Sequence, residues 1–203
     1  NENVQKEPYS LPEGYEWAEL DLSKTNELDK LYDFLKTNYV QDDSSLFGTE
    51  YSKEFLKWYF SCPNSKNNLL SVMKEDKVKN KKKIVGFISG IPAKISVKGT
   101  MIQTKKINFL CVKKELRFHN LATVLMQEII RRIHLEKVCQ GIYATFTLVP
   151  TPFCKTSYYY RNINVQKLVD IKYTFLPNGM NIKKAIKNYE LPEKPQIEGF
   201  RKM

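Results

Sequence analysis

Residues 106–132 decide the fold, and they read KINFLCVKK followed at once by ELRFHNLATVLMQEIIRR. The first part contains a short apolar run over 107–112, interrupted only by Asn108, which is typical of a strand covered on both faces. From Asn120 onward, apolar residues recur at steps of three and four, which predicts a helix over 120–137 with one apolar side. The stretch therefore predicts a buried strand, a turn and a long helix.

The turn between this strand and this helix is a candidate anion site. The first N–H groups of a helix have no partner within the helix, and together with the positive end of the helix dipole they favour phosphate. Arg117 and His119 lie in the turn. An ordinary core strand and core helix would give the same pattern, so the spacing alone leaves both interpretations open.

The remaining elements follow from local patterns. Residues 1–19 are expected to form an extended arm, and short polar or Pro-containing turns between strands favour antiparallel order. Asn26, Ser52 and Asn181 are candidate helix caps. The predicted strands are 69–73, 83–91, 94–98, 105–112, 141–148 and 171–175, and the predicted helices are 26–36, one after Ser52, 120–137, 164–170 and 181–190.

Composition predicts a globular chain without structural metal. The chain has 203 residues, of which 42% are hydrophobic, so one compact domain with a sizeable core is expected. Its four cysteines show no Cys-x-x-Cys pair, which makes a zinc site improbable and fits a reducing compartment. Cys111 is most simply a small core residue, although a chemical role stays open. No signal peptide or long apolar span is evident, which favours a cytoplasmic protein.

Positive charge is concentrated near the middle of the chain. The net charge is +11, and residues 77–83 read KVKNKKK. A solvated hairpin loop is the simplest interpretation, because apolar strands flank the run on both sides. Non-specific binding of nucleic acid or of an anionic membrane surface is the alternative.

The central stretch also resembles a known enzyme family. The run NFLCV at 108–112, followed by Leu116-Arg117 and Leu121-Ala122, is similar to the signature of the N-myristoyltransferases. These enzymes transfer a fatty acyl group from acyl-CoA to an N-terminal glycine. Further segments resemble the same family in the same order, and they are 7–17, 38–43, 54–58, 85–92, 131–136 and 158–164.

The resemblance implies a fold and a domain organisation. The expected class is α+β, with an N-acetyltransferase-like, mixed and largely antiparallel sheet flanked by helices. The family fold has two related halves, so residues 1–203 are expected to form a single domain equivalent to the acyl-CoA-binding first half. The second half, which carries the family's carboxylate base, is expected to be absent.

The resemblance also implies a set of site residues. The backbone amides of Phe109 and Leu110 would form an oxyanion hole, and a β-bulge there would be its structural sign. Myristoyl-CoA is the expected acyl donor, with no metal, and the cofactor positions are Phe109, Leu110, Cys111, Val112, Arg117, Phe118, Asn120, Leu121 and Ala122. The N-terminal glycine peptide would meet Tyr39, Asp42, Asp43, Tyr158 and Tyr160. Leu125, Ile129 and Tyr143 could line space for the acyl chain or simply pack in the core.

Several positions depart from the family pattern. Lys106 and Lys113 replace a Glu and a His at the two ends of the strand, and the basic turn Arg-Ser-Lys-Arg reads Arg-Phe-His-Asn over 117–120. Phe146 and Tyr160 replace a Gly and a His. Phe118 and Asn120 predict weaker phosphate affinity, unless His119, Lys113 or Lys114 compensates.

Three functions are consistent with these features. The first is a glycylpeptide N-myristoyltransferase, acting near ribosomes or membranes, where a positive surface would also attract a polyanionic acyl-CoA. The second is a divergent acyltransferase of the same fold that uses shorter acyl-CoA. The third is a non-catalytic module whose basic patch binds nucleic acid or membrane, which steep salt dependence without acyl-CoA affinity would indicate.

Overall fold

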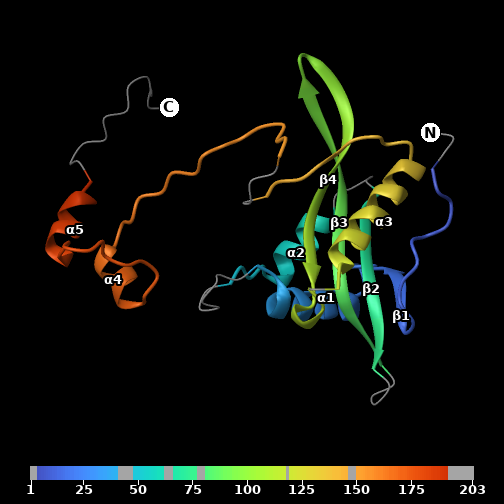
Figure 1. The fold of residues 1–203 in the computed structure, drawn as a ribbon, viewed down its shortest axis with the longest axis horizontal. Helices are drawn as coiled ribbons and strands as arrows, with labels where there is room; N and C mark the ends of the chain where they lie inside the picture. The colour runs from blue at the N-terminus through green and yellow to red at the C-terminus, as the bar shows by residue number, and fades with distance from the viewer. Residues whose placement is uncertain are drawn as a thin grey trace. The chain divides into compact units, whose positions relative to one another are not determined.

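The structure is a computed structural model that describes residues 4–40, 48–61, 66–76, 81–117, 119–145 and 150–191. The chain divides into two compact units, residues 1–146 and 147–203, and each is described by itself. The expectation of one domain over 1–203 stays a prediction. Figure 1 shows the helices and strands of both units.

A five-stranded sheet forms the centre of the first unit. Its strands are β1 (Tyr15–Glu19), β2 (Asn68–Asp76), β3 (Lys81–Val97), β4 (Thr100–Val112) and β5 (Gly141–Ile142), and they lie side by side in chain order. The first four pair antiparallel, as short connections dictate, whereas β5 pairs parallel to β4 after the chain has crossed over through a helix. The predicted mixed, largely antiparallel sheet is confirmed.

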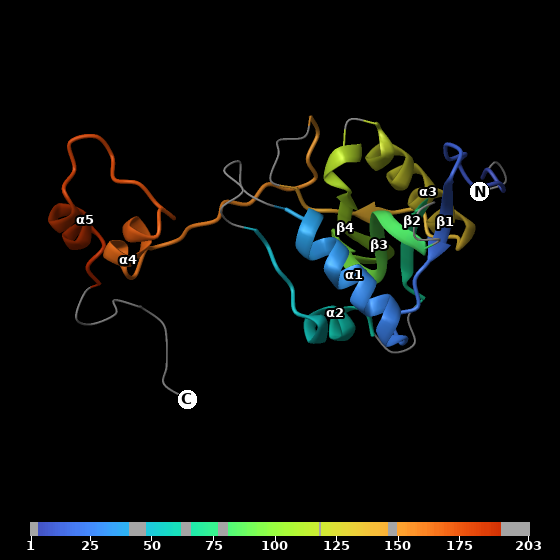
Figure 2. The ribbon, with the colours of Figure 1, turned by 90° about the horizontal axis from the view of Figure 1, so that it is seen from below.

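Helices cover both faces of this sheet. Successive residues of a strand point to opposite faces, so Phe87 and Ile88 of β3 enter two different cores. The helices α1 (Thr25–Asn38) and α2 (Lys53–Phe60) pack on the face of Phe87, and α3 (Leu121–Leu135) packs on the face of Ile88. Figure 2 shows α1 and α3 on opposite sides of the strands. The predicted α+β class is thereby confirmed.

Glycines on β3 allow α3 to approach the sheet closely. A Cβ atom added to Gly86 would lie 2.9 Å from Cδ1 of Leu125, and one added to Gly90 would lie 3.3 Å from Cδ1 of Ile129. Both distances are shorter than ordinary carbon contacts. The two glycines therefore fix how deeply the first and middle turns of α3 sit on the sheet.

The predicted break between strands 83–91 and 94–98 is wrong. β3 continues through Pro92 as a single strand that pairs with β4 up to Val97. The pairing of β2 with β3 ends at Gly90, so β3 and β4 continue beyond it as a two-stranded ribbon, visible in Figure 1. Proline is tolerated at such an edge because no third strand needs its missing N–H.

Two of the three predicted helix caps are confirmed. The Ser52 hydroxyl accepts a hydrogen bond from the amide of Phe55 at 3.1 Å, and Asn181 caps α5 (Ile182–Asn188) through the amide of Lys184 at 2.8 Å. The predicted cap at Asn26 is wrong, because α1 already begins at Thr25 and its N-cap is Lys24.

The second unit contains α4 (Val165–Asp170) and α5, joined by a turn. The amides of Tyr173 and Thr174 donate to the carbonyl of Leu168 at 2.9 and 3.2 Å, so the predicted strand 171–175 is a helix-terminating turn instead. The predicted strand 141–148 is confirmed only over Gly141–Ile142, and residues 143–145 are not in a strand. Among the helices of the described ranges, none has the length and apolarity that a membrane crossing requires.

Candidate active site

A β-bulge interrupts β4 where the sequence placed the oxyanion hole. Phe87 pairs with Cys111 and Ser89 pairs with Asn108, so Ile88 alone faces both Phe109 and Leu110. Phe109 has a φ of 55°, in the left-handed region. This region is strained for a bulky side chain and persists only where the surrounding structure enforces it. The bulge that was expected as the structural sign is therefore present.

Side chains on three elements hold the bulge. The amide of Phe109 donates to Oδ1 of Asn108 at 2.9 Å. Nδ2 of Asn108 donates to the hydroxyl of Tyr59 at 3.2 Å, and the buried Ser89 hydroxyl donates to the Asn108 carbonyl at 2.9 Å. Asn108 thus links α2, β3 and the bulge, and it directs the Phe109 N–H toward a side chain.

The Phe109 ring is the centre of an aromatic core. It is 2% exposed, and its centroid lies 5.3 to 5.7 Å from those of four other rings, which belong to Tyr39, Tyr51, Tyr59 and Phe60. Aromatic pairs at this separation stabilise beyond their buried area. Leu110 is 37% exposed. The packing of Phe109 therefore counteracts the strain of its backbone, while its neighbour stays accessible.

The turn after β4 is tied to the end of α1. The chain leaves β4 through a short 3-10 helix, η1 (Lys114–Leu116). The guanidinium of Arg117 donates to the carbonyl of Asn38 and to that of Val112, the second at 3.4 Å. Oδ1 of the buried Asn38 accepts from the amide of Lys114 at 3.2 Å. Arg117 is thus engaged by backbone carbonyls and is only partly available for an anion.

We expect Asn38→Ala to loosen this turn. The substitution removes the acceptor of the Lys114 amide and the donor to the Phe34 carbonyl at 2.9 Å, which are two hydrogen bonds of a buried side chain. The loss should destabilise the fold by about 2 kcal/mol in chemical denaturation. Thr37→Ala, which removes an exposed bond to the Asp33 carbonyl one position earlier, is the control and should stay within about 0.5 kcal/mol.

The start of α3 has an unusual cap. Asn120 has a φ of 57° and, within the described part of the chain, its side chain makes no capping hydrogen bond. Its Oδ1 instead accepts from the Thr123 hydroxyl at 2.6 Å, and its carbonyl accepts from the amide of Thr123 at 3.1 Å. Leu121 and Ala122 are the first two residues of α3, and their amides come before the Thr123 amide in the first turn. An anion at this end of α3 would meet those two amides.

Cys111 is a core residue in this structure. It is 4% exposed, on the face of the sheet that carries Phe109 and Phe87. Burial raises the pKa of its thiol to about 12, although the Arg117 charge opposes the shift. A neutral thiol is a poor nucleophile, so the geometry favours the packing role. Within the described ranges, no group of three His, Cys, Asp or Glu side chains comes together as metal ligands.

The predicted peptide-binding residues lie in different units or outside the described residues, so their grouping stays a prediction. Tyr39 ends α1, is half-buried, and lies with its ring centroid 5.7 Å from that of Phe109. Burial raises its pKa to about 12. Tyr158 and Tyr160 are exposed in the second unit, which is described separately. Asp42 and Asp43, like Phe118 of the cofactor set and Phe146, lie outside the described residues.

The apolar residues considered for the acyl chain divide between core and surface. Leu125 and Ile129 are fully buried and pack against β3 through Gly86 and Gly90. Tyr143 is 58% exposed. Core packing accounts for Leu125 and Ile129, so these three residues do not share one cavity wall.

Comparisons with known proteins agree on one family. Residues 1–156 match the family "Myristoyl-CoA:protein N-myristoyltransferase, N-terminal domain". Glycylpeptide N-tetradecanoyltransferase 1 of Arabidopsis thaliana is 40% identical over 200 residues, which are 98% of this chain and 45% of that protein. Glycylpeptide N-tetradecanoyltransferase of Plasmodium falciparum (isolate 3D7) is 41% identical over 203 residues, 100% of this chain and 48% of that protein.

Structural comparison gives the same result. The crystal structure of Saccharomyces cerevisiae N-myristoyltransferase with bound myristoyl-CoA superposes with a TM-score of 0.80 at 32% identity, covering 100% of this chain and 45% of that one. The chain spans less than half the length of the relatives described here. On the matched residues and the shared fold, the chain belongs to the N-myristoyltransferase family, and its residues 1–156 match that family's N-terminal domain.

Proposed function

We propose that this chain binds myristoyl-CoA and takes part in transferring the myristoyl group to the N-terminal glycine of proteins. One observation carries the proposal, namely the left-handed Phe109 in a bulge that lies immediately before the turn into α3. Strained backbone of this kind persists at functional sites, and the relatives are named for this reaction.

The bulge suits the chemistry of acyl transfer. The neutral glycine amine attacks the thioester carbonyl, whose oxygen becomes an oxyanion. The C–S bond then breaks as the carbonyl re-forms, and the proton that the nitrogen loses balances the departing thiolate, so that the products are the amide and the CoA thiol. Backbone N–H groups fixed at the oxyanion stabilise it better than water does. The amides of Phe109 and Leu110 would donate to that oxygen, and the Asn108 carboxamide, which now accepts from Phe109, would give way.

The polar end of the donor would lie over the turn. The phosphates would meet the first turn of α3, where the amides of Leu121 and Ala122 follow Asn120. The wider set of proposed cofactor positions is Phe109, Leu110, Cys111, Val112, Arg117, Phe118, Asn120, Leu121 and Ala122. Because Arg117 is held by two carbonyls, it contributes its charge more than new hydrogen bonds.

The acceptor and the cellular setting belong to the same proposal. Tyr39, Asp42, Asp43, Tyr158 and Tyr160 would border the peptide, with the two carboxylates attracting basic residues in it. The protein would be cytoplasmic, and its net charge of +11 would favour proximity to ribosomes or anionic membranes.

A ligand titration tests the proposal directly. Myristoyl-CoA, acetyl-CoA and free CoA are each titrated into the chain by calorimetry at one salt concentration. We expect myristoyl-CoA to bind at least about tenfold more tightly than acetyl-CoA, since buried methylenes each contribute about 0.8 kcal/mol.

The alternatives give different results in the same titration. Equal affinity for the short and the long thioester would indicate a divergent acyltransferase without a long apolar site. Binding of none of the three CoA compounds would contradict the proposal. The non-catalytic module would be favoured if, in addition, a nucleic acid bound with steep salt dependence.

A further inference from the structure

Two hydrogen bonds in series join α2 to the bulge in β4, and they end on one of the amides proposed for the oxyanion hole. The Phe109 amide donates to Oδ1 of Asn108 at 2.9 Å, and Nδ2 of Asn108 donates to the Tyr59 hydroxyl at 3.2 Å. An N–H group needs an acceptor, so the carboxamide oxygen must face Phe109, which leaves the NH₂ end for Tyr59. The two bonds therefore fix one orientation of the carboxamide.

The Tyr59 ring gives this connection a firmly packed end. Tyr59 is half-buried on α2, and its ring stacks on that of Phe55, four residues earlier, with 5.7 Å between the ring centroids. It also makes edge contacts with the rings of Phe60 at 5.2 Å and Phe109 at 5.3 Å. Aromatic pairs at these separations are stabilising. Contacts with three rings thus hold the hydroxyl beside Asn108.

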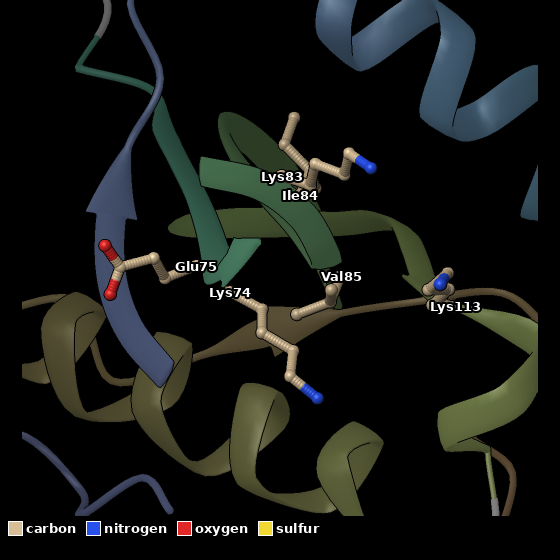
Figure 3. Close-up of a pocket in the computed structure, with 6 residues that line it drawn as sticks. All are labelled: Lys74, Glu75, Lys83, Ile84, Val85 and Lys113. Carbon is tan, nitrogen blue, oxygen red and sulfur yellow. The ribbon is translucent and has the colours of Figure 1, made fainter. Parts of the chain in front are cut away.

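The backbone on both sides of the bulge is fixed, which leaves the Asn108 side chain as the part that can turn. Before the bulge, the buried Ser89 hydroxyl donates to the Asn108 carbonyl at 2.9 Å. After it, strand pairing resumes, and the Lys113 amide donates to the Val85 carbonyl at 2.9 Å. Figure 3 shows Val85 and Lys113, which line a hollow at the end of β4. Release of the Phe109 amide therefore requires the carboxamide to turn.

The carboxamide occupies the place that a ligand oxygen would need. A thioester oxygen, or the oxyanion formed from it, gains the full hydrogen bond of the Phe109 amide only when Oδ1 of Asn108 leaves. The carboxamide is planar, like a peptide group, so a turn that moves Oδ1 away from Phe109 also moves Nδ2 away from Tyr59. Opening the hole thus breaks two hydrogen bonds, of which the ligand replaces one.

We infer that Tyr59 is a positioning residue which, through Asn108, keeps the Phe109 amide occupied until the carbonyl of an acyl-CoA takes it. The pair of Tyr59 and Asn108 is called the latch below. The inference rests on the proposed function, since it describes how the proposed oxyanion hole is closed in the free protein. Only the open form donates fully to the carbonyl, so the apparent affinity for a thioester rises with the fraction of open molecules.

Removal of one hydroxyl tests the latch in the free protein. In Tyr59→Phe the carboxamide loses one of its two bonds, and we expect the Phe109 amide to exchange with solvent deuterium about fivefold faster, the factor that one neutral hydrogen bond predicts. NMR-detected amide exchange measures the rate.

Tyr51→Phe is the matched control for this exchange measurement. Tyr51 is also half-buried, and its ring centroid likewise lies 5.3 Å from that of Phe109. In the described part of the chain, the hydroxyl that Asn108 bonds is that of Tyr59 instead. The exchange rate of the Phe109 amide in Tyr51→Phe should therefore stay within about twofold of the parent rate.

A pair of ligands tests the latch in binding. Myristoyl-CoA and S-tetradecyl-CoA, a thioether of equal chain length in which a methylene replaces the carbonyl, are titrated by calorimetry into the parent chain and both variants. We expect Tyr59→Phe to bind the thioester about fivefold more tightly than the parent does, and the thioether within about twofold of the parent affinity. Tyr51→Phe should bind both compounds as the parent does.

A double variant checks that Tyr59 acts through Asn108. Asn108→Ala removes the latch at its other member, so adding Tyr59→Phe to it should leave the thioester affinity unchanged within about twofold. A fivefold gain from Tyr59→Phe in both backgrounds would mean that Tyr59 acts on the ligand by another route, and the latch would be overturned.

The remaining outcomes separate the latch from the proposed function. Unchanged exchange at Phe109 in Tyr59→Phe, no gain in thioester affinity, or an equal gain for thioester and thioether would overturn the latch and leave the proposed function intact. A parent chain that binds neither compound would overturn the proposed function and, with it, the role of the latch in ligand binding.

Discussion

Phe109→Ala is expected to destabilise the fold by about 4 kcal/mol, because a large core side chain is replaced by a methyl group. The ring is 2% exposed and contacts four other aromatic rings, which the smaller side chain leaves facing a cavity. Urea or guanidinium unfolding, followed by far-ultraviolet circular dichroism, measures the change. The loss would also release Asn108 and Tyr59, which hold the bulge.

Phe109→Gly separates the effect of the backbone conformation from the loss of the ring. In an ordinary strand, a protein with glycine is less stable than one with alanine by roughly 0.5–1 kcal/mol. At a left-handed φ of 55°, the glycine variant should instead be the more stable of the two by about 1 kcal/mol. Both variants lose the ring, so their difference reports the backbone alone. If the glycine variant proves less stable than the alanine variant, Phe109 does not have the left-handed conformation, and the structural support for the oxyanion hole is lost.

Sequence patterns predicted the parts of the fold that depend on near neighbours. The Ser52 cap and the long helix α3 follow from residues three or four positions apart, so local periodicity was sufficient. Pro92 was misinterpreted as the end of a strand, because whether a proline is tolerated depends on where β2 stops pairing, and this is set far away in the chain. The strand predicted at 171–175 is wrong because the same apolar residues can also form the turn that ends a helix.

The site was predictable only as far as the family resemblance extended. The resemblance placed the oxyanion hole at Phe109 and Leu110, and the bulge now found there is consistent with that role. Nothing in the local pattern marked Asn38, whose side chain accepts from an amide 76 residues later. Asn38 falls in the segment 38–43 that resembles the family, but the resemblance gave it no role, and its burial at the last position of α1 is visible only in the structure.

Glu128 lies on the buried side of α3, and it is the most consequential polar residue of that helix. It is fully buried, and its carboxylate accepts from Arg131 at 2.7 and 2.8 Å and from Arg132 at 2.8 Å. The amide of Tyr9 donates to it at 3.1 Å, and Arg131 donates to the carbonyl of Lys6 at 2.8 Å. The network thereby fastens the N-terminal arm to α3.

We expect Glu128→Gln to destabilise the fold by about 3 kcal/mol in chemical denaturation, because Arg131 remains buried without a counter-charge. The arm should detach at the same time, which hydrogen exchange at Tyr9 and tryptic cleavage after Lys6 would both detect. Glu19→Gln is the matched control, since Glu19 makes an exposed pair with Arg132 at 3.7 Å and its loss should cost less than about 1 kcal/mol.

The same network predicts a dependence of stability on pH. Burial alone would raise the pKa of Glu128, but the hydrogen bonds from Arg131, Arg132 and the Tyr9 amide outweigh it and hold that pKa below its ordinary value of 4.5. A carboxyl with a depressed pKa in the folded state stabilises fully above its unfolded pKa, and the stabilisation disappears as the pH falls through the folded value. Parent and Glu128→Gln should therefore differ most in unfolding free energy near neutral pH, and the difference should shrink as the pH falls below 4.5 through the folded pKa. A constant difference between pH 7 and pH 3 would mean that the side chain contributes by its shape and hydrogen bonds, and that its charge adds nothing to the attachment of the arm.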